Sequence, residues 1–172
     1  MERSYEIKCI REIIMEQTYL DIMIQSLNKK IQVLDKIAEL NILQKKQLED
    51  MKVPVEEFDN TIEEKGKLIE QLELLDAGFD KLYDRVKSEL RSNRETYAPK
   101  IAELQECIRQ ITAKNIDIQA QEARNKELMI HKFAFIKQSA KIVRTNTRVV
   151  SKYHNNMLQL NYVDPQFMDN KK

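Results

Sequence analysis

Apolar side chains recur every three or four residues along most of the chain, and charged residues fill the positions between them. The clearest seam, with spacings that alternate between four and three, is made of Leu20, Ile24, Leu27, Ile31, Leu34 and Ala38. A seam with this heptad spacing is typical of a long amphipathic helix that packs against other helices. The pattern predicts three such helices, over about residues 5–51, 54–92 and 98–158.

Residues that break helices are scarce and mark the expected ends of these elements. The glycines and prolines among the 172 residues are Gly66, Gly78, Pro54, Pro99 and Pro165. Pro54 suits the first turn of the second helix, because its missing N–H is not needed there. Pro99 predicts a turn over 92–99, and a kinked continuation is the alternative. The two glycines lie inside the second helical pattern and predict close approach to a neighbouring helix.

The three predicted helices define the expected fold class, which is an all-α, elongated, coiled-coil-like antiparallel bundle in a single domain spanning residues 1–172. Because a helix rises about 1.5 Å per residue, the second helix should end opposite residue 137 of the third. The C-terminal part of the third helix, about 137–160, is therefore expected to overhang the hairpin. We expect residues 161–172, which contain Asp164 and Pro165, to form a flexible tail.

The expected overhang carries an apolar stripe that no other predicted helix covers. Its members are Ile142, Val143, Val149, Val150, Tyr153, Met157, Leu158 and Leu160. A contiguous apolar stripe without a cover inside the molecule predicts an interaction site. The alternative is that the stripe is buried in the bundle or in a homodimer.

Charge is distributed unevenly, although the formal net charge is only +1. Acids outnumber bases over 56–89, whereas no Asp or Glu occurs between Glu127 and Asp164. A basic stripe along one helix face comprises Lys137, Lys141, Arg144, Arg148 and Lys152. Either this stripe complements the acidic helix of the same molecule, or it docks an acidic partner.

Three polar residues interrupt the apolar seam of the third helix: Asn115, Glu122 and Asn125. Polar residues at seam positions fix the register of packed helices at a cost in stability. We interpret the three residues in this way. The alternative is that the seam faces water there.

Composition agrees with amphipathic helices, because 42% of residues are hydrophobic and 33% are charged. No apolar run approaches the roughly 20 residues that cross a bilayer, and the N-terminus lacks the apolar segment of a signal peptide. We therefore expect a cytoplasmic protein without direct membrane insertion. Cys9 and Cys107 lie far apart in the sequence and are expected to be reduced thiols.

No arrangement of residues in the sequence predicts catalysis or a bound cofactor. His131 and His154 are isolated, and adjacent carboxylates such as Glu56 and Glu57 diverge on a helix. We therefore expect no enzyme activity, no metal and no cofactor. The basic stripe lacks interleaved aromatic residues that stack on bases, so nucleic acid is not an expected partner.

Several segments resemble the FlgN family of bacterial flagellar export chaperones. They are YLDIMIQSLNKKIQVLDKIAELNILQKKQLE, VEEFDNTIEEKGKLIEQLELLDAGFDKLYDRV, QAQEARNKELM and the ending QFMDNKK. The order of features is similar: a long first helix with Leu/Ile heptads, a turn with proline, then an acidic segment. That acidic segment carries Phe58, Asp59, the Glu64–Lys65 pair, Leu68 and Leu72. The resemblance covers the chain from about Tyr19 to its C-terminus.

The resemblance implies a cytoplasmic chaperone, without enzyme activity, for flagellar hook-associated (junction) proteins before their type III secretion. Such a chaperone grips the amphipathic C-terminal helix of its client through its own C-terminal segment. It then delivers the complex to an export gate component at the membrane. The same features leave open the related FliT class, whose clients are filament-cap proteins.

The residues of the C-terminal segment can be assigned partner-binding roles on this basis. Expected apolar contacts are Ile142, Val143, Val149, Val150, Tyr153, Met157 and Leu160. Flanking residues that would steer an acidic client helix are Lys141, Arg144, Arg148 and Lys152. Tyr153 and Tyr162 are candidates for contact with the export gate.

Two further alternatives follow from the sequence. The first is a structural coiled-coil protein that acts as a homodimeric scaffold, with the overhang buried in the dimer. We expect instead a monomer or a weak homodimer. The second concerns Met15, which looks like a natural start for the family, so that residues 1–14 would be an extension or a misassigned start.

Overall fold

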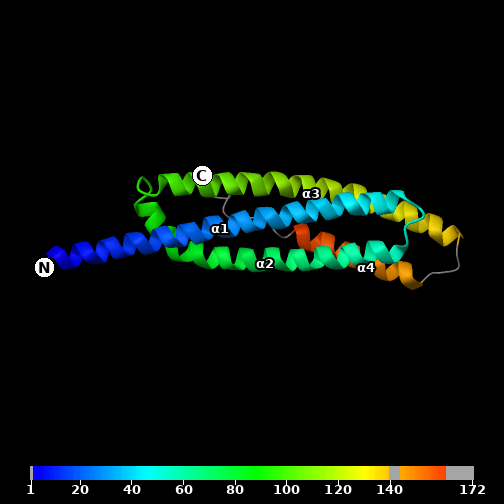
Figure 1. Ribbon diagram of the computed structural model, residues 1–172, viewed down its shortest axis with the longest axis horizontal. Coiled ribbons are helices and arrows are strands. Elements are labelled where there is room, and N and C mark those ends of the chain that lie inside the picture. Colours follow the sequence, from blue (N-terminus) through cyan, green and yellow to red (C-terminus); the bar gives the residue numbers. More distant parts are fainter. Residues whose placement is uncertain (1, 140–143, 162–172) are drawn as a thin grey trace.

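The computed structural model describes residues 2–139 and 144–161, and these residues form four helices (Figure 1). They are α1 (Glu2–Glu49), α2 (Val55–Ser92), α3 (Ala98–Ser139) and α4 (Arg144–Asn161). The first three are long, and each runs antiparallel to the one before it in the chain, whereas α4 is short. The predicted all-α antiparallel architecture of three long helices is therefore confirmed, with a fourth helix added.

Both predicted turns are present. Pro54 has φ −62° and ψ 149° and precedes α2, whose first turn carries Glu56 and Glu57 where the positive end of the helix dipole favours acids. At the other end of α2, the backbone N–H of Asn93 donates to the carbonyl oxygen of Glu89 at 2.9 Å. The backbone then turns over 93–97 before α3 begins, so the kinked continuation is wrong.

The prediction that the third helix continues to about residue 158 is wrong. The helix α3 ends at Ser139, and α4 packs back against α2 and α3 (Figure 1). Val149 and Tyr153 are only 2% and 1% exposed, so the molecule itself covers this face of the expected overhang, whereas Val150 and Leu158 of the same stripe are exposed. Burial of this apolar stripe against α2 and α3 outweighs the helix propensity that favours a straight continuation.

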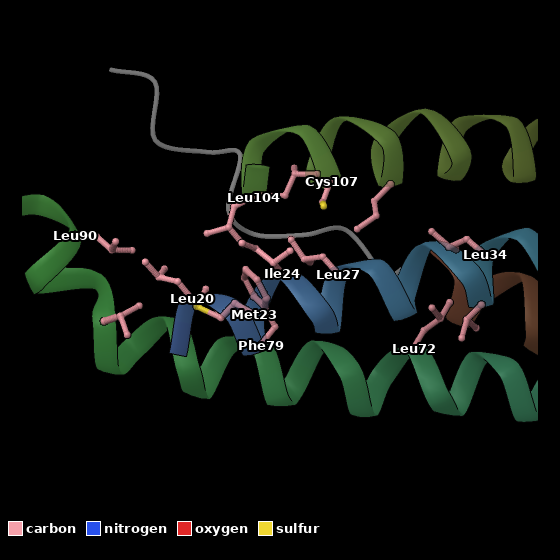
Figure 2. Close-up of a cluster of buried hydrophobic side chains, with 14 of the residues drawn as sticks. Leu20, Met23, Ile24, Leu27, Leu34, Leu72, Phe79, Leu90, Leu104 and Cys107 are labelled. Atoms are coloured by element: carbon pink, nitrogen blue, oxygen red, sulfur yellow. The ribbon is translucent and has the colours of Figure 1, made fainter. Parts of the chain in front are cut away.

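The helix α1 lies between α2 and α3 and packs against both, and α4 packs against the same two helices from the other side. The larger core cluster joins α1, α2 and α3 toward the α2–α3 turn (Figure 2). In Figure 2 the clustered side chains point toward one another from these helices, and those labelled are Leu20, Met23, Ile24, Leu27, Leu34, Leu72, Phe79, Leu90, Leu104 and Cys107. We call this region the apolar end.

The relative directions of the helices follow from their polar contacts. Cys107 of α3 contacts Asn28 of α1, and Lys114 contacts Asp35, each pair 79 residues apart. This constant offset shows that α1 and α3 run parallel and in register. In contrast, Lys30 of α1 donates to Asp76 at 2.6 Å within the antiparallel α1–α2 pair.

The two glycines of α2 have different surroundings. A Cβ atom on Gly66 would lie 3.6 Å from Oδ1 of Asn156 in α4, which is an ordinary contact distance. A Cβ atom on Gly78 would meet no described atom within 4 Å. A neighbouring helix therefore lies beside Gly66, and the prediction of close approach is wrong at Gly78.

Candidate functional site

The helix α4 lies in a groove between α2 and α3, close to the α1–α2 turn. Its buried side chains, Val149 and Tyr153, are spaced four residues apart and therefore share one helix face with the partly buried Met157. The buried residues that they meet from the other helices are Leu48, Phe58, Ile62, Met129 and Phe133. The rings of Tyr153 and Phe58 are stacked, with their centroids 6.0 Å apart. We call this region of the bundle the α4 end.

Tyr153 is the central contact of α4. Its hydroxyl donates a hydrogen bond of 2.9 Å to the backbone carbonyl oxygen of Glu122. The ammonium of Lys65 lies 5.3 Å from the centroid of its ring, within the range of a cation–π interaction. Burial, with a further contribution from Glu122, raises the pKa of Tyr153 well above its ordinary value of 10.0. The hydroxyl therefore stays protonated and remains a donor.

A buried polar layer lies directly beneath Tyr153 and consists of Gln44, Thr61, Lys65 and Glu122. Nζ of Lys65 is 2.5 Å from a carboxylate oxygen of Glu122 and 2.6 Å from Oε1 of Gln44. Gln44 in turn donates to the hydroxyl of Thr61 at 3.2 Å. Burial lowers the pKa of Lys65, although the carboxylate of Glu122 opposes this effect. The layer thus joins α1, α2 and α3 where α4 docks.

The polar seam positions of α3 face the inside of the bundle. Glu122 and Asn125 are buried, and Asn115 is half-buried. Asn125 donates a hydrogen bond of 2.8 Å to the backbone carbonyl of Asn41. The alternative that this seam faces water is therefore wrong at Glu122 and Asn125, and their specific partners are those expected of register-setting residues.

The rim of the groove on α2 is acidic and engages α4 through charge. Nζ of Lys152 lies 2.9 Å from Oδ1 of Asp59 and 2.8 Å from Oε1 of Glu63. The hydrogen bonds that Lys152 donates to Glu63 and Asp59 raise the pKa of its ammonium. Further along, Asn156 donates to the backbone carbonyl of Ile62 at 2.9 Å. Lys152 therefore complements the acidic helix of the same molecule, the first of the two interpretations of the basic stripe.

The other predicted partner-binding residues have different positions in the structure. The side chains of Arg148 and Val150 are exposed, and so is that of Lys137 in the basic stripe. Arg144 and Leu160 belong to α4, but their side chains are outside the described part of the structure. The predicted residues outside the described ranges are Lys141, Ile142, Val143 and Tyr162.

Sequence reasoning missed the groove that receives α4. The α2 and α3 residues that line it were interpreted only as parts of helical seams. One signal was present, because Asp59 and Glu63 are four residues apart and share a helix face. Their charge is opposite to that of Lys152, which lies on the covered face of α4.

A buried lysine fastens α3 to the α1–α2 turn at this end of the bundle. Nζ of Lys132 donates to the backbone carbonyls of Gln47, Asp50 and Val53 at 2.6, 2.9 and 3.0 Å. Gln47 lies in the last turn of α1, where helix carbonyls lack partners within the helix and cations are favoured, and Asp50 and Val53 follow in the α1–α2 turn. Burial lowers the pKa of Lys132, and the charge of Asp50 opposes this effect.

Among the described residues, no group of three or more His, Cys, Asp or Glu side chains could hold a metal ion. No described helix is long and apolar enough to cross a membrane. His131 and His154 are both exposed and lie on different helices. The geometry of the site is that of helix docking, with apolar contacts, one aromatic anchor and a charged rim.

A comparison with protein-family models gives a match over residues 15–156, to the family described as FlgN protein. No curated protein and no solved structure matches the chain. The match begins at Met15, and it covers α2, α3 and most of α1 and α4. The expected resemblance and the expected absence of enzyme activity are therefore confirmed. The chain belongs to the FlgN family, the non-enzymatic flagellar export chaperones for hook-associated (junction) proteins.

Proposed function

We propose that this chaperone binds the C-terminal helix of its hook-associated client at the α4 end. In this proposal α4 separates from its groove, and contacts with the client replace the contacts of α4. The observation that carries the proposal is the seating of an amphipathic helix in the groove between α2 and α3. This is the geometry of helix-in-groove recognition. The predicted contacts Val149, Tyr153 and Met157 become available to a client once α4 separates from the groove.

The exchange is energetically feasible because the same types of contact are lost and regained. Separation of α4 uncovers its own apolar face and the groove residues Phe58, Ile62, Met129 and Phe133. A client helix can shift this equilibrium only by the difference between its affinities for the two states. An amphipathic client helix supplies that difference, since it covers apolar surface that would otherwise face water.

The remaining predicted residues extend the proposed client surface. Arg148 and Val150 are exposed beside the docked face of α4. The other proposed members are Lys141, Ile142, Val143, Arg144 and Leu160. We propose that Tyr162 contacts the export gate component at the membrane, with Tyr153 contributing only when α4 has separated. Cytoplasmic location and a monomer or weak homodimer complete the proposal, in place of a homodimeric scaffold.

A reversible cross-link between α4 and α2 tests the exchange. Gly66→Cys and Asn156→Cys place two thiols where a Cβ atom on residue 66 would lie 3.6 Å from Oδ1 of Asn156. The background carries Cys9→Ser and Cys107→Ala. We expect the oxidised protein to lose at least about 100-fold in affinity for the client, which corresponds to about 2.7 kcal/mol. Reduction should restore binding.

The matched control links α1 to α3 at the apolar end, by Asp21→Cys with Lys100→Cys, two residues that form an ion pair far from α4. Client affinity should be the same for its oxidised and reduced forms. Equal client binding by the oxidised and reduced forms of the α2–α4 variant would show that α4 need not separate, and the proposed site would then be wrong. Calorimetry with the purified client measures all four states.

A further inference from the structure

The contacts of α4 with the groove are chemically specific. The apolar floor accepts any aliphatic side chain, whereas three polar contacts demand particular groups. Asp59 and Glu63 hold an ammonium, the backbone carbonyl of Glu122 accepts from a hydroxyl, and the carbonyl of Ile62 accepts from an amide. The helix α4 meets these demands with Lys152, Tyr153 and Asn156, and these positions fit within about one helical turn.

We propose that the groove selects a client helix that repeats the pattern of α4, and this inference rests on the proposed function. The pattern is a Lys or Arg directly before an aromatic residue, with an amide side chain three positions later. Aliphatic residues occupy the positions four before and four after the aromatic, as Val149 and Met157 do in α4. Asp59 and Glu63 are thereby specificity-determining residues for the client.

The negative charge of the groove rim determines the sign of the charge that the client helix must carry there. When α4 separates, the carboxylates of Asp59 and Glu63 lose the ammonium of Lys152. A basic client residue restores this pair, whereas an acidic residue at the same position meets like charge and is rejected. The segment of the client that enters the groove is therefore basic, although the stripe of Lys and Arg in the sequence favours an acidic helix.

The floor of the groove determines the preference for an aromatic residue. Lys65 and Glu122 form an ion pair that the ring of Tyr153 covers in the docked state. An aromatic ring offers its electron-rich face to the ammonium of Lys65, which an aliphatic side chain cannot do. The stacking partner Phe58 favours the same choice.

The contacts also determine the direction of the client helix. Lys152 contacts Asp59 at an offset of 93 residues, and Asn156 contacts Ile62 at an offset of 94. The nearly constant offset means that α4 runs parallel to α2. A client helix that satisfies the same three polar contacts must run parallel to α2 as well.

A labelled peptide with the sequence of residues 144–161 tests this pattern without any client. The host is the full chain with Tyr153→Ala, in which the docking of its own α4 is weakened, and Lys152→Ala provides a second host. Circular dichroism confirms that each host is helical. We expect fluorescence anisotropy to show saturable binding of the peptide. A peptide that itself carries Tyr153→Ala should bind at least about tenfold more weakly.

A charge exchange then tests the rim. Asp59→Lys with Glu63→Lys in the host should lower the affinity of the peptide at least about tenfold. A peptide with Lys152→Glu should bind this reversed host better than it binds the unreversed one. The control host carries Glu70→Lys, which changes an exposed acid one heptad further along α2, and it should bind the original peptide normally.

The outcomes separate this inference from the proposed function. The pattern would be overturned if the original peptide and the peptide with Lys152→Glu bound equally well to the unreversed and the reversed host. It would also be overturned if neither peptide bound. If the α2–α4 cross-link still blocked binding of the client in that case, the proposed function would stand without the sequence pattern. The chain could instead form dimers that the peptide dissociates but the client does not. Such a result would assign the groove to a second copy of the chain and overturn the inference.

Discussion

The two ends of the bundle are held together by different kinds of interaction. At the apolar end, three helices share a large cluster of aliphatic and aromatic side chains, and Lys30 is the buried charge beside it among the described residues. The α4 end has four helices and a smaller apolar cluster. The remaining buried polar residues lie toward it: Asn41, Gln44, Gln47, Thr61, Lys65, Glu122, Asn125 and Lys132.

This difference indicates a division of roles. Apolar burial supplies stability without directional requirements, so the apolar end serves as a permanent frame. Buried ion pairs and hydrogen bonds add little net stability, but they penalise any arrangement that leaves a member unpaired. The α4 end therefore discriminates between helices that could dock there. Under the proposed function, in which the chaperone accepts a client helix and releases it again, this separation is an advantage.

The largest expected effect comes from breaking the Lys65–Glu122 pair. Glu122→Leu leaves a buried ammonium without its carboxylate, which we expect to cost about 3–5 kcal/mol in the free energy of unfolding. Adding Lys65→Met should recover most of that loss, because no unpaired charge is then buried, although Oε1 of Gln44 loses the ammonium that donates to it. Urea denaturation measures each variant. Equal stabilities of the single and double variants would mean that the pair is not a coupled buried unit.

A truncation at the apolar end should be nearly as costly but should have no compensating partner. Leu72 is fully buried, and we expect Leu72→Ala to cost about 2–5 kcal/mol in the free energy of unfolding. The control is Leu74→Ala on the same helix, where the side chain is 75% exposed and the change should stay within about 0.5 kcal/mol. Denaturation curves for the two variants that coincide would contradict the assignment of the core.

A smaller effect distinguishes the α4 end by its dependence on pH. In the unfolded chain Tyr153 loses its proton near its ordinary pKa of 10.0, whereas burial raises the pKa in the folded state. The folded state then binds more protons above that pH, so the free energy of unfolding falls as pH rises. We expect the decline between pH 9 and 11 to be steeper in the unmodified chain than in Tyr153→Phe, by up to about 1.4 kcal/mol per pH unit.

At neutral pH, Tyr153→Phe removes only one hydrogen bond and should cost about 0.5–1.5 kcal/mol. Denaturation curves recorded at several pH values provide both measurements. Parallel pH profiles for the two proteins would show that the hydroxyl is accessible to water, and the docked position of α4 would then be in doubt.

The smallest expected effect is a gain in stability from Gly78→Ala. This glycine lies inside α2, and a Cβ atom there meets no described atom within 4 Å. Replacing a helical glycine by alanine should therefore raise the free energy of unfolding by about 0.5–1 kcal/mol. Thermal melting detects the gain, and a lower melting temperature would indicate a neighbour at this position.

The sequence predicted the helices and turns well, because their signals are local. Pro54 and Pro99 mark the starts of α2 and α3, and the heptad seams identify the faces that are buried. The packing of α4 back against α2 gave no such signal, since the sequence between Ser139 and Arg144 contains neither glycine nor proline. The sequence therefore favoured a straight helix to residue 158.

The candidate site was predicted only in part, again because the sequence carries local signals. The periodicity of Val149, Tyr153 and Met157 identifies an apolar face, but it is the same whether the helix continues or folds back. It therefore cannot show which surface covers that face. The partner surface on α2 and α3 depends on contacts between residues about 30 to 90 positions apart, such as Tyr153 with Glu122 and Lys152 with Asp59.

The parallel register of α1 and α3 has a consequence for how the chain folds. The polar contacts between these helices join residues 79 to 85 positions apart, whereas the antiparallel α1–α2 hairpin brings together residues as few as 10 positions apart. Closing longer loops costs more chain entropy, and distant contacts slow folding. The hairpin can therefore form early during synthesis, while the second side of α1 stays uncovered until α3 has been made.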